Sequence, residues 1–133
     1  MQKKDMLTSK RLRHLEAMIS EMTVDELNAK MKRGEIFKLL EVSNPNDFEK
    51  GHIEGAIHIL IDVLETEAEK RFRKFEQIVV YTREASSSVG MVAVRKLQAL
   101  GFSNVLLLRG GSEAWQNANL SLSENKVEVK SEG

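Results

Sequence analysis

Four hydroxyl side chains lie close together in the sequence, in a stretch that could supply a nucleophile. They are Thr82, Ser86, Ser87 and Ser88. A hydroxyl becomes a nucleophile only with help from a neighbouring base or an N-terminal amine. The three histidines of the chain are His14, His52 and His58, and all of them lie outside this stretch. Hydroxyl chemistry here would therefore need one histidine to approach in space.

Cysteine is absent from all 133 residues. Its absence removes thiolate nucleophiles, persulfide carriers, disulfides and cysteine metal sites together. His52 and His58 are six residues apart, and the chain has no His-Glu-x-x-His pattern. We therefore expect neither a metal nor a cofactor.

The hydroxyl-rich stretch should lie where parallel sheets bind ligands. Residues 77–82 are predicted to form a strand because their run of Ile78, Val79 and Val80 is β-branched. The serine cluster can cap a helix over residues 88–100. Ligands of such sheets bind beyond the carboxyl ends of strands, so the loop from Thr82 to Ser88 is the expected site, and it should keep a strand-to-helix reversal.

The other elements alternate between apolar strands and helices. Strands are predicted over residues 36–42, 56–61 and 105–108, and helices over residues 6–22, 45–50, 62–72 and 112–118. A further helix should begin at Thr23, where Thr23 and Glu26 form a capping box, and end at Gly34. This pattern predicts an α/β fold of three layers, with a central, mostly parallel sheet of about five strands between helices.

Three stretches in this order resemble the rhodanese-like, or rhodanese homology, domain family. They are Leu39–Val42 with Asp47–Ala56, then Val79–Tyr81, then Gly110–Trp115. The phrases Gly-His-Ile-Glu-Gly-Ala and Gly-Gly-x-x-Ala-Trp are the most specific parts of this resemblance. It implies a rhodanese-like fold, a structural role for His52 in bonding backbone across its turn, and an active-site loop after Tyr81.

That loop departs from the family pattern, which runs Cys-Arg-x-Gly-x-Arg. The loop here is Thr82-Arg83-Glu84-Ala85-Ser86-Ser87. Thr82 replaces the nucleophile, Ala85 the Gly and Ser87 the second Arg, so only Arg83 matches. A Thr hydroxyl is not ionised near neutral pH and cannot carry a sulfane sulfur. The resemblance therefore implies a single-domain member that is not an enzyme, with no catalytic residue and a degenerate loop.

Two kinds of function stay open. The first is a binding or regulatory module, with a protein partner or self-association, or with a small anion sensed by the loop. Its possible anion-binding residues are Arg83, Ser86, Ser87 and Ser88. The alternative is a rhodanese-type sulfurtransferase, acting on thiosulfate or persulfide sulfur through a non-standard or partner-supplied nucleophile. The serines could also serve only as caps.

Glu41 and Ser43 replace the Asp and Arg usual in the family, which leaves the substrate entrance in doubt.

Composition excludes several classes of partner. Lys plus Arg equals Asp plus Glu at 20 each, so no bulk charge attracts nucleic acid or an anionic membrane. No apolar run approaches the roughly 20 residues that span a bilayer, and no secretory signal is recognised. We expect a cytoplasmic protein that binds neither nucleic acid nor membrane.

The chain divides into three expected parts: a basic amphipathic helical extension over residues 1–22, a rhodanese-like domain over residues 23–122 and a polar tail over residues 123–133. The extension's cations are Lys3, Lys4, Lys10, Arg11 and Arg13. Its apolar stripe includes Leu12, Leu15, Met18 and Ile19. Such a stripe should pack against protein, in its own domain or in a second chain.

Overall fold

A five-stranded parallel sheet forms the centre of the computed structural model, which describes residues 19–84 and 88–124. The strands are β1 (Ser20–Met22), β2 (Lys38–Glu41), β3 (Ile57–His58), β4 (Gln77–Tyr81) and β5 (Asn104–Leu108), in the order β1-β5-β4-β2-β3. Each neighbouring pair runs parallel. The central strand β4 is buried on both faces from Ile78 to Tyr81, which explains its unbroken apolar sequence.

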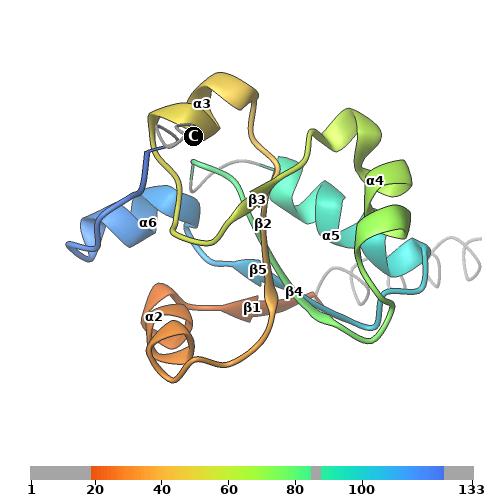
Figure 1. Ribbon diagram of the computed structural model, residues 1–133, viewed down its shortest axis with the longest axis horizontal. Coiled ribbons are helices and arrows are strands. Elements are labelled where there is room, and N and C mark those ends of the chain that lie inside the picture. Colours follow the sequence, from red (N-terminus) through yellow and green to blue (C-terminus); the bar gives the residue numbers. More distant parts are fainter. Residues whose placement is uncertain (1–18, 85–87, 125–133) are drawn as a thin grey trace, which may run out of the picture.

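Helices cover both faces of this sheet. They are α2 (Val24–Lys32), α3 (Pro45–Lys50), α4 (Leu64–Arg71), α5 (Val89–Ala99) and α6 (Gly111–Asn117), with a short 3₁₀ helix η1 (Ile61–Val63) before α4. Figure 1 shows α2 and α6 on one side of the sheet and α4 and α5 on the other. The predicted three-layer α/β fold is therefore confirmed. No helix in the described ranges is long and apolar enough to cross a membrane.

Successive side chains of β4 point alternately into two separate hydrophobic cores. Ile78 and Val80 point into the α4–α5 core, with Leu64 and Leu97. Val79 and Tyr81 point into the α2–α6 core, which includes Leu27 and Trp115. This alternation follows from the two-residue period of a strand. It also makes Trp115 a core residue.

Local capping fixes the first helices as the sequence predicts. The Thr23 hydroxyl accepts from the Glu26 amide at 3.1 Å, and the Thr23 amide donates to the Glu26 carboxylate at 2.8 Å. Asn44 caps α3 by accepting from the Asp47 amide at 2.9 Å, with Pro45 in the first turn. The capping box and the short helix over residues 45–50 are both confirmed.

The helix predicted over residues 6–22 is wrong at its C-terminal end. Ser20–Met22 is strand β1, paired with Leu106–Leu108 along the edge of β5. That edge offers backbone hydrogen bonds to a strand, and Met22 is buried in the α2–α6 core. The sheet therefore includes residues assigned above to the extension, while residues 1–18 lie outside the described residues.

Other boundaries shift by smaller amounts. Ile36 is 93% exposed, so the strand predicted from residue 36 begins only at Lys38. The helix predicted over residues 62–72 begins only at Leu64, because residues 61–63 form η1, and it ends at Arg71. Ser123, placed in the tail, forms an antiparallel bridge to His52 with hydrogen bonds of 2.8 and 2.7 Å.

Candidate functional site

The predicted loop begins where β4 ends, and its first residues are held in place by α6. The amide of Ser112 donates to the Thr82 carbonyl at 3.0 Å, and the amide of Glu113 donates to the Arg83 carbonyl at 2.9 Å. The Thr82 side chain is 7% exposed, and its hydroxyl donates to the Glu84 carbonyl at 3.2 Å. The one hydroxyl proton of Thr82 is thus already engaged within the loop.

Gly111 explains why α6 can come so close to this loop. Its φ is +62°, and a Cβ atom at this position would lie 2.2 Å from the Thr82 carbonyl oxygen. Only a glycine permits both the left-handed backbone and this contact. The Gly110-Gly111 pair of the sequence motif therefore positions the loop.

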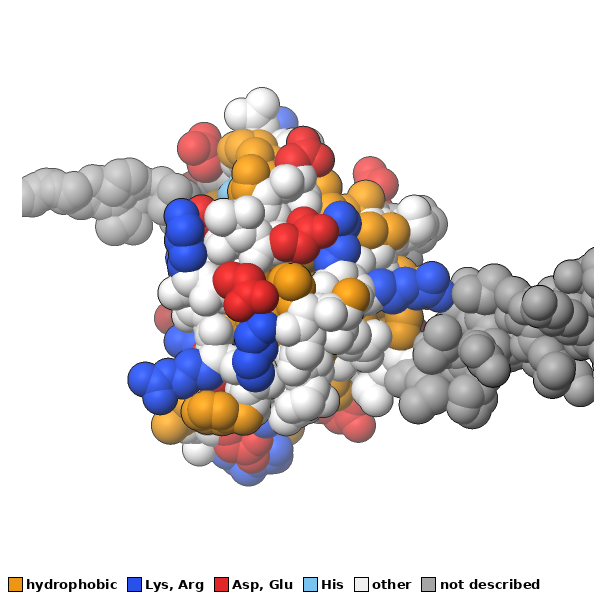
Figure 2. Space-filling view, turned by 90° about the vertical axis from the view of Figure 1, so that its right-hand side faces the viewer, with side chains coloured by type: hydrophobic (Ala, Val, Ile, Leu, Met, Phe, Trp, Pro, Cys, Tyr) orange, Lys and Arg blue, Asp and Glu red, His pale blue; other side chains and the backbone are white. Residues whose placement is uncertain are grey.

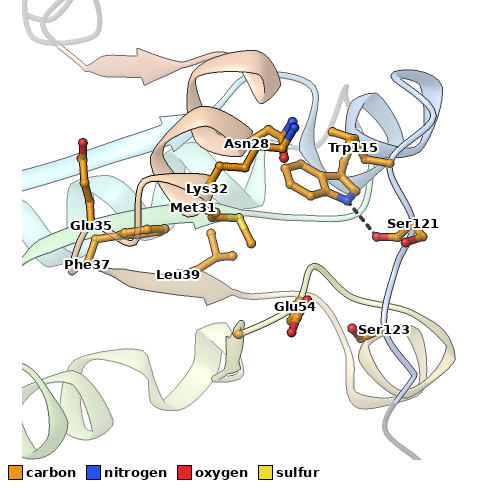
Figure 3. Close-up of a pocket in the computed structure, with 12 residues that line it drawn as sticks. Asn28, Met31, Lys32, Glu35, Phe37, Leu39, Glu54, Trp115, Ser121 and Ser123 are labelled. Atoms are coloured by element: carbon orange, nitrogen blue, oxygen red, sulfur yellow. Dashed lines mark hydrogen bonds between the residues drawn. The ribbon is translucent and has the colours of Figure 1, made fainter.

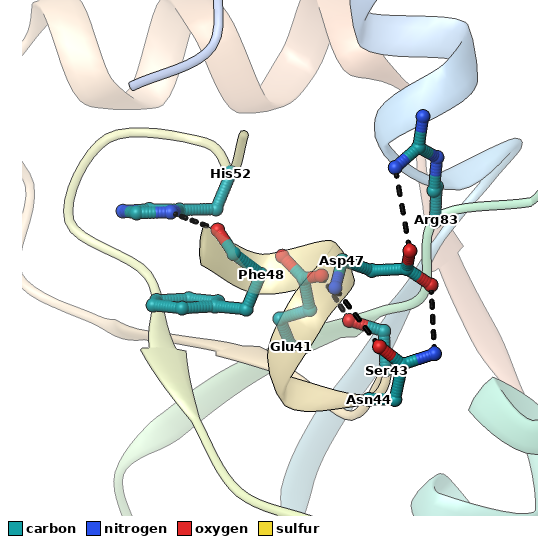
Figure 4. Close-up of polar contacts among 7 residues, drawn as sticks. All are labelled: Glu41, Ser43, Asn44, Asp47, Phe48, His52 and Arg83. Atoms are coloured by element: carbon teal, nitrogen blue, oxygen red, sulfur yellow. Dashed lines mark hydrogen bonds and ion pairs between the residues drawn. The ribbon is translucent and has the colours of Figure 1, made fainter. Parts of the chain in front are cut away.

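Arg83 leans away from the loop toward α3, as Figure 4 shows. Its Nη1 atom lies 3.5 Å from Oδ1 of Asp47, while Oδ2 of Asp47 accepts from Asn44 at 3.0 Å. The Arg83 side chain is about half exposed, so solvent screens this ion pair. The guanidinium proposed to bind an anion therefore already has a carboxylate neighbour.

The serines of the loop are only partly accounted for. Ala85, Ser86 and Ser87 lie outside the described residues. Ser88 is exposed and occupies the N-cap position of α5, but its side chain makes no capping hydrogen bond, so side-chain capping by Ser88 is wrong. The chain does reverse from β4 into α5, as predicted.

Thr82 and Glu84 line two cavities. One of about 360 Å³ lies toward α3 and η1, and the other of about 310 Å³ lies toward β1 and β5. The first is lined by Asp47, Leu60, Arg83, Glu84 and Val89, among others. The second is lined by Glu21, Glu84, Met91, Arg109 and Gly110, among others. In the second cavity Arg109 pairs with Glu21 at 2.9 Å.

A buried polar pair lies below the loop, at the ends of β2 and β4. Glu41 is 1% exposed, accepts from the Ser43 hydroxyl, and its second carboxylate oxygen has no hydrogen-bond partner. The Tyr81 hydroxyl accepts from the Ile53 amide at 3.0 Å. Burial raises the pKa of Tyr81 far above its usual value, and the Glu41 charge adds to this. Tyr81 is not among the predicted site residues; its one signal in the sequence is an aromatic hydroxyl at the end of an aliphatic strand.

The two histidines in the described residues, His52 and His58, have structural contacts. Nδ1 of His52 lies 2.7 Å from the Phe48 carbonyl oxygen, and the two rings stack at 3.8 Å. Nε2 of His58 lies 2.5 Å from the Ser43 carbonyl oxygen. Neither histidine is hydrogen-bonded to Thr82. The predicted structural role of His52 in bonding backbone across its turn is confirmed.

A larger cavity, of about 610 Å³, lies elsewhere in the molecule. Figure 3 shows it between α2, the Glu54 turn and the segment after α6. Trp115 forms one wall, and its indole nitrogen donates to the Ser121 carbonyl at 3.0 Å. None of Thr82, Arg83 and Glu84 lines this cavity, so it is separate from the loop.

A family model for the rhodanese-like domain matches residues 23–118. The chain belongs to the rhodanese-like domain family. The match runs from the capping box of α2 to the end of α6. It therefore covers the strand, loop and helix that form the candidate site of this rhodanese-like domain.

Relatives and solved structures agree with this assignment. The Uncharacterized protein YibN of Escherichia coli K12 is 27% identical over 115 residues, covering 78% of this chain and 80% of YibN. The Alr3790 protein of Anabaena sp. is 29% identical with a TM-score of 0.74, covering 80% of this chain and 95% of that chain. A thiosulfate sulfurtransferase of Pseudomonas aeruginosa is 30% identical with a TM-score of 0.73, covering 80% of this chain and 20% of that chain.

Proposed function

We propose that this rhodanese-like domain is catalytically inactive and acts as a binding module whose contact surface includes the Thr82 loop. The observation that carries the proposal is the state of the Thr82 hydroxyl. It is buried and donates to the Glu84 carbonyl, in a chain that has no cysteine. To act as a nucleophile, the Thr82 hydroxyl would have to lose its hydrogen bond to Glu84 and be deprotonated by a neighbouring base.

Sulfur transfer makes demands that Thr82 does not meet. The attacking atom must be largely ionised near neutral pH and must then hold a second sulfur atom. An alcohol meets neither requirement without strong activation. His52 and His58 each contact a backbone carbonyl elsewhere, so neither supplies a base to Thr82 in this arrangement. These features support a loss of chemistry with the fold retained.

The charges around the loop support a protein partner over a small anion. Arg83 is paired with Asp47, and Arg109 is paired with Glu21. Glu84 lines both cavities beside Thr82 and forms no ion pair with the described residues. An anion entering either cavity would meet this carboxylate while the nearby guanidinium groups are already paired. The module is therefore proposed to bind a protein.

Inactivity is tested by measuring thiosulfate-dependent formation of thiocyanate from cyanide. The purified chain should give no rate above the buffer blank, with a cysteine-containing sulfurtransferase as the positive control. Turnover that co-purifies with the chain and exceeds the blank would support the alternative, an enzyme with a non-standard nucleophile.

Binding is tested with a single engineered cysteine, because the natural chain offers no competing thiol. Glu84→Cys, labelled with a photo-crosslinker, should capture the same discrete protein in repeated extracts of the source cells. Ile36→Cys is the matched control, since Ile36 is 93% exposed and precedes β2, at the opposite edge of the sheet from the loop after β4. Equal capture by both positions would contradict a role for the loop surface.

A further inference from the structure

The cavity of about 610 Å³ beside Trp115, which we name the Trp115 cavity, has walls that are held in place by hydrogen bonds. The Trp115 indole donates to the Ser121 carbonyl at 3.0 Å. Two residues further on, Ser123 exchanges backbone hydrogen bonds of 2.8 and 2.7 Å with His52. The segment after α6 is thus tied both to α6 and to the turn after α3, so the cavity is preformed, as ligand sites usually are.

The interior of the Trp115 cavity is apolar. Its apolar lining residues come from α2, from β2 and the segment before it, and from α6 and the segment after it. They are Met31, Phe37, Leu39, Trp115 and Leu120. Leu39 and Trp115 are buried in the α2–α6 core, and the other three pack against it. Ligand pockets measure about 300–1,000 Å³, so this cavity suits a small organic molecule with an apolar body.

The α2 wall of the cavity is positively charged. The charged residues that line the cavity, among those described, are Lys32, Glu35 and Glu54. Glu35 is already engaged, because it accepts from Lys30 Nζ at 2.7 Å and from Arg33 Nε at 2.6 Å. Lys32 forms no ion pair with the described residues. The end of α2 therefore carries three cations against one carboxylate.

Other acidic residues near this wall do not reverse its charge. Asp25 and Glu26 lie in the first turn of α2, and Asp25 is about 10 Å from Lys32 along the helix axis. Glu26 is engaged in the capping box. Glu113 and Glu124 have partners of their own, and neither of them lines the cavity.

Polar groups on the two walls would orient an anionic ligand. Asn28 lies one turn before Lys32 on the α2 wall, and its side-chain amide forms no hydrogen bond with the described residues. Figure 3 shows Glu54 across the cavity from Asn28 and Lys32. The Glu54 carboxylate repels an anionic group, which is therefore directed to the α2 wall. There a carboxylate would accept charge-assisted hydrogen bonds.

We propose that the Trp115 cavity binds a small amphipathic carboxylate. The apolar body lies between Leu39 and Trp115, and the carboxylate accepts from Lys32 and Asn28. This site is separate from the Thr82 loop, so it goes beyond the proposed function and holds or fails without it.

Naphthylacetate serves as the probe, because it joins an apolar body to one carboxylate. Titrated into the isotope-labelled full-length chain, it should shift the NMR signal of the Trp115 indole N–H, the only indole in the chain, with a Kd of about 1 mM or lower. Naphthylethanol and naphthylethylamine, which lack the carboxylate, should bind about fivefold more weakly or worse. Shifts that do not saturate, shifts that are largest at Thr82, or equal or tighter binding of either analogue would overturn the proposal.

Two lysine substitutions separate the contact from net charge. Lys32→Gln should raise the Kd of naphthylacetate by about fivefold or more and leave that of naphthylethanol unchanged. Lys70→Gln is the matched control, since it removes the same charge from an exposed position of α4, across the sheet. Figure 2 views the molecule from the α4–α5 side and shows hydrophobic side chains at the surface among charged ones, so non-specific binding would also occur there.

The control should leave the Kd of naphthylacetate unchanged. An equal loss of affinity in both variants would show a response to net charge, and no loss in Lys32→Gln would remove the carboxylate contact. Either result would overturn the proposal. The remaining NMR signals show that each variant is folded.

Discussion

Three residues separate the Thr82 loop from the motif of its family, and each has a distinct physical effect. Thr82 lacks an ionisable sulfur, Ala85 restricts the backbone where the family has Gly, and Ser87 lacks the positive charge of the second Arg. Because fold and family are retained, the proposed loss of activity should be chemical and should be repaired in steps.

Restoring these residues should restore activity in the same order. Thr82→Cys alone should give a titratable thiol with poor turnover of thiosulfate, because neither the backbone nor the positive field is rebuilt. Adding Ala85→Gly and Ser87→Arg should raise turnover by about tenfold or more, as expected when charge stabilisation is regained. A triple variant no faster than Thr82→Cys alone would show that other parts of the site have also been lost.

Tyr81 allows the buried polar pair to be measured, because it is the only tyrosine in the chain. Burial raises its pKa in the folded protein, while the unfolded chain titrates near its usual value of about 10. The stability that neutral Tyr81 contributes is therefore fully present below about pH 10 and is lost as pH rises above it. Tyrosinate absorbance should appear together with loss of helical circular dichroism, and not before it.

Tyr81→Phe tests the same group without titration. It leaves the buried Ile53 amide without its acceptor and should lower the free energy of unfolding by roughly 1–3 kcal/mol at neutral pH. Denaturant unfolding measures this change. The variant should also lose part of the decline in stability above about pH 10, whereas an unchanged alkaline profile would contradict the role assigned to Tyr81.

Elements whose signals are local could be predicted from the sequence, and those set by distant contacts could not. The capping box of α2, the Asn44-Pro45 start of α3 and the apolar run of β4 each depend on neighbouring residues. Strand β1 has three residues and exists because it pairs with β5, more than 80 positions away. The Tyr81–Glu41 contact likewise depends on two strands meeting side by side.

At the site, family resemblance located the loop but could not describe its contacts. The Arg83–Asp47 pair and the anchoring of Thr82 by α6 both join segments that are far apart in the sequence. The Gly110-Gly111 pair belongs to the family phrase, but the close approach of Gly111 to the Thr82 carbonyl depends on how α6 packs and cannot be derived from the sequence.

The contact between α6 and the loop can be tested with two matched glycine substitutions. Gly111 and Gly34 both have positive φ, at +62° and +70°, so alanine meets backbone strain of about 1–2 kcal/mol at each. Only at Gly111 would the new Cβ atom meet backbone, while the space at Gly34 is open. Gly111→Ala should therefore reach the upper part of the range for single substitutions, about 3 kcal/mol or more. Similar losses in free energy of unfolding for both variants would contradict this close approach.

At the scale of the whole molecule, one sheet joins two cores. On strand β4, Ile78 and Val80 point into the α4–α5 core. Val79 and Tyr81 point into the α2–α6 core. In the described residues, both helical layers pack their buried side chains against this one sheet. The two cores should therefore form and be lost together, as in other small single domains.

A cavity created in one core should shift the unfolding midpoint that is measured by a probe in the other core. Leu97 is fully buried in the α4–α5 core, and Leu97→Ala should lower the free energy of unfolding by about 2–5 kcal/mol. Trp115, the only tryptophan, lies in the α2–α6 core and reports on that side by its fluorescence. In denaturant, the fluorescence and circular dichroism midpoints should shift by the same amount. If the fluorescence midpoint stayed in place while circular dichroism moved, the two faces would unfold independently and the sheet would not couple them.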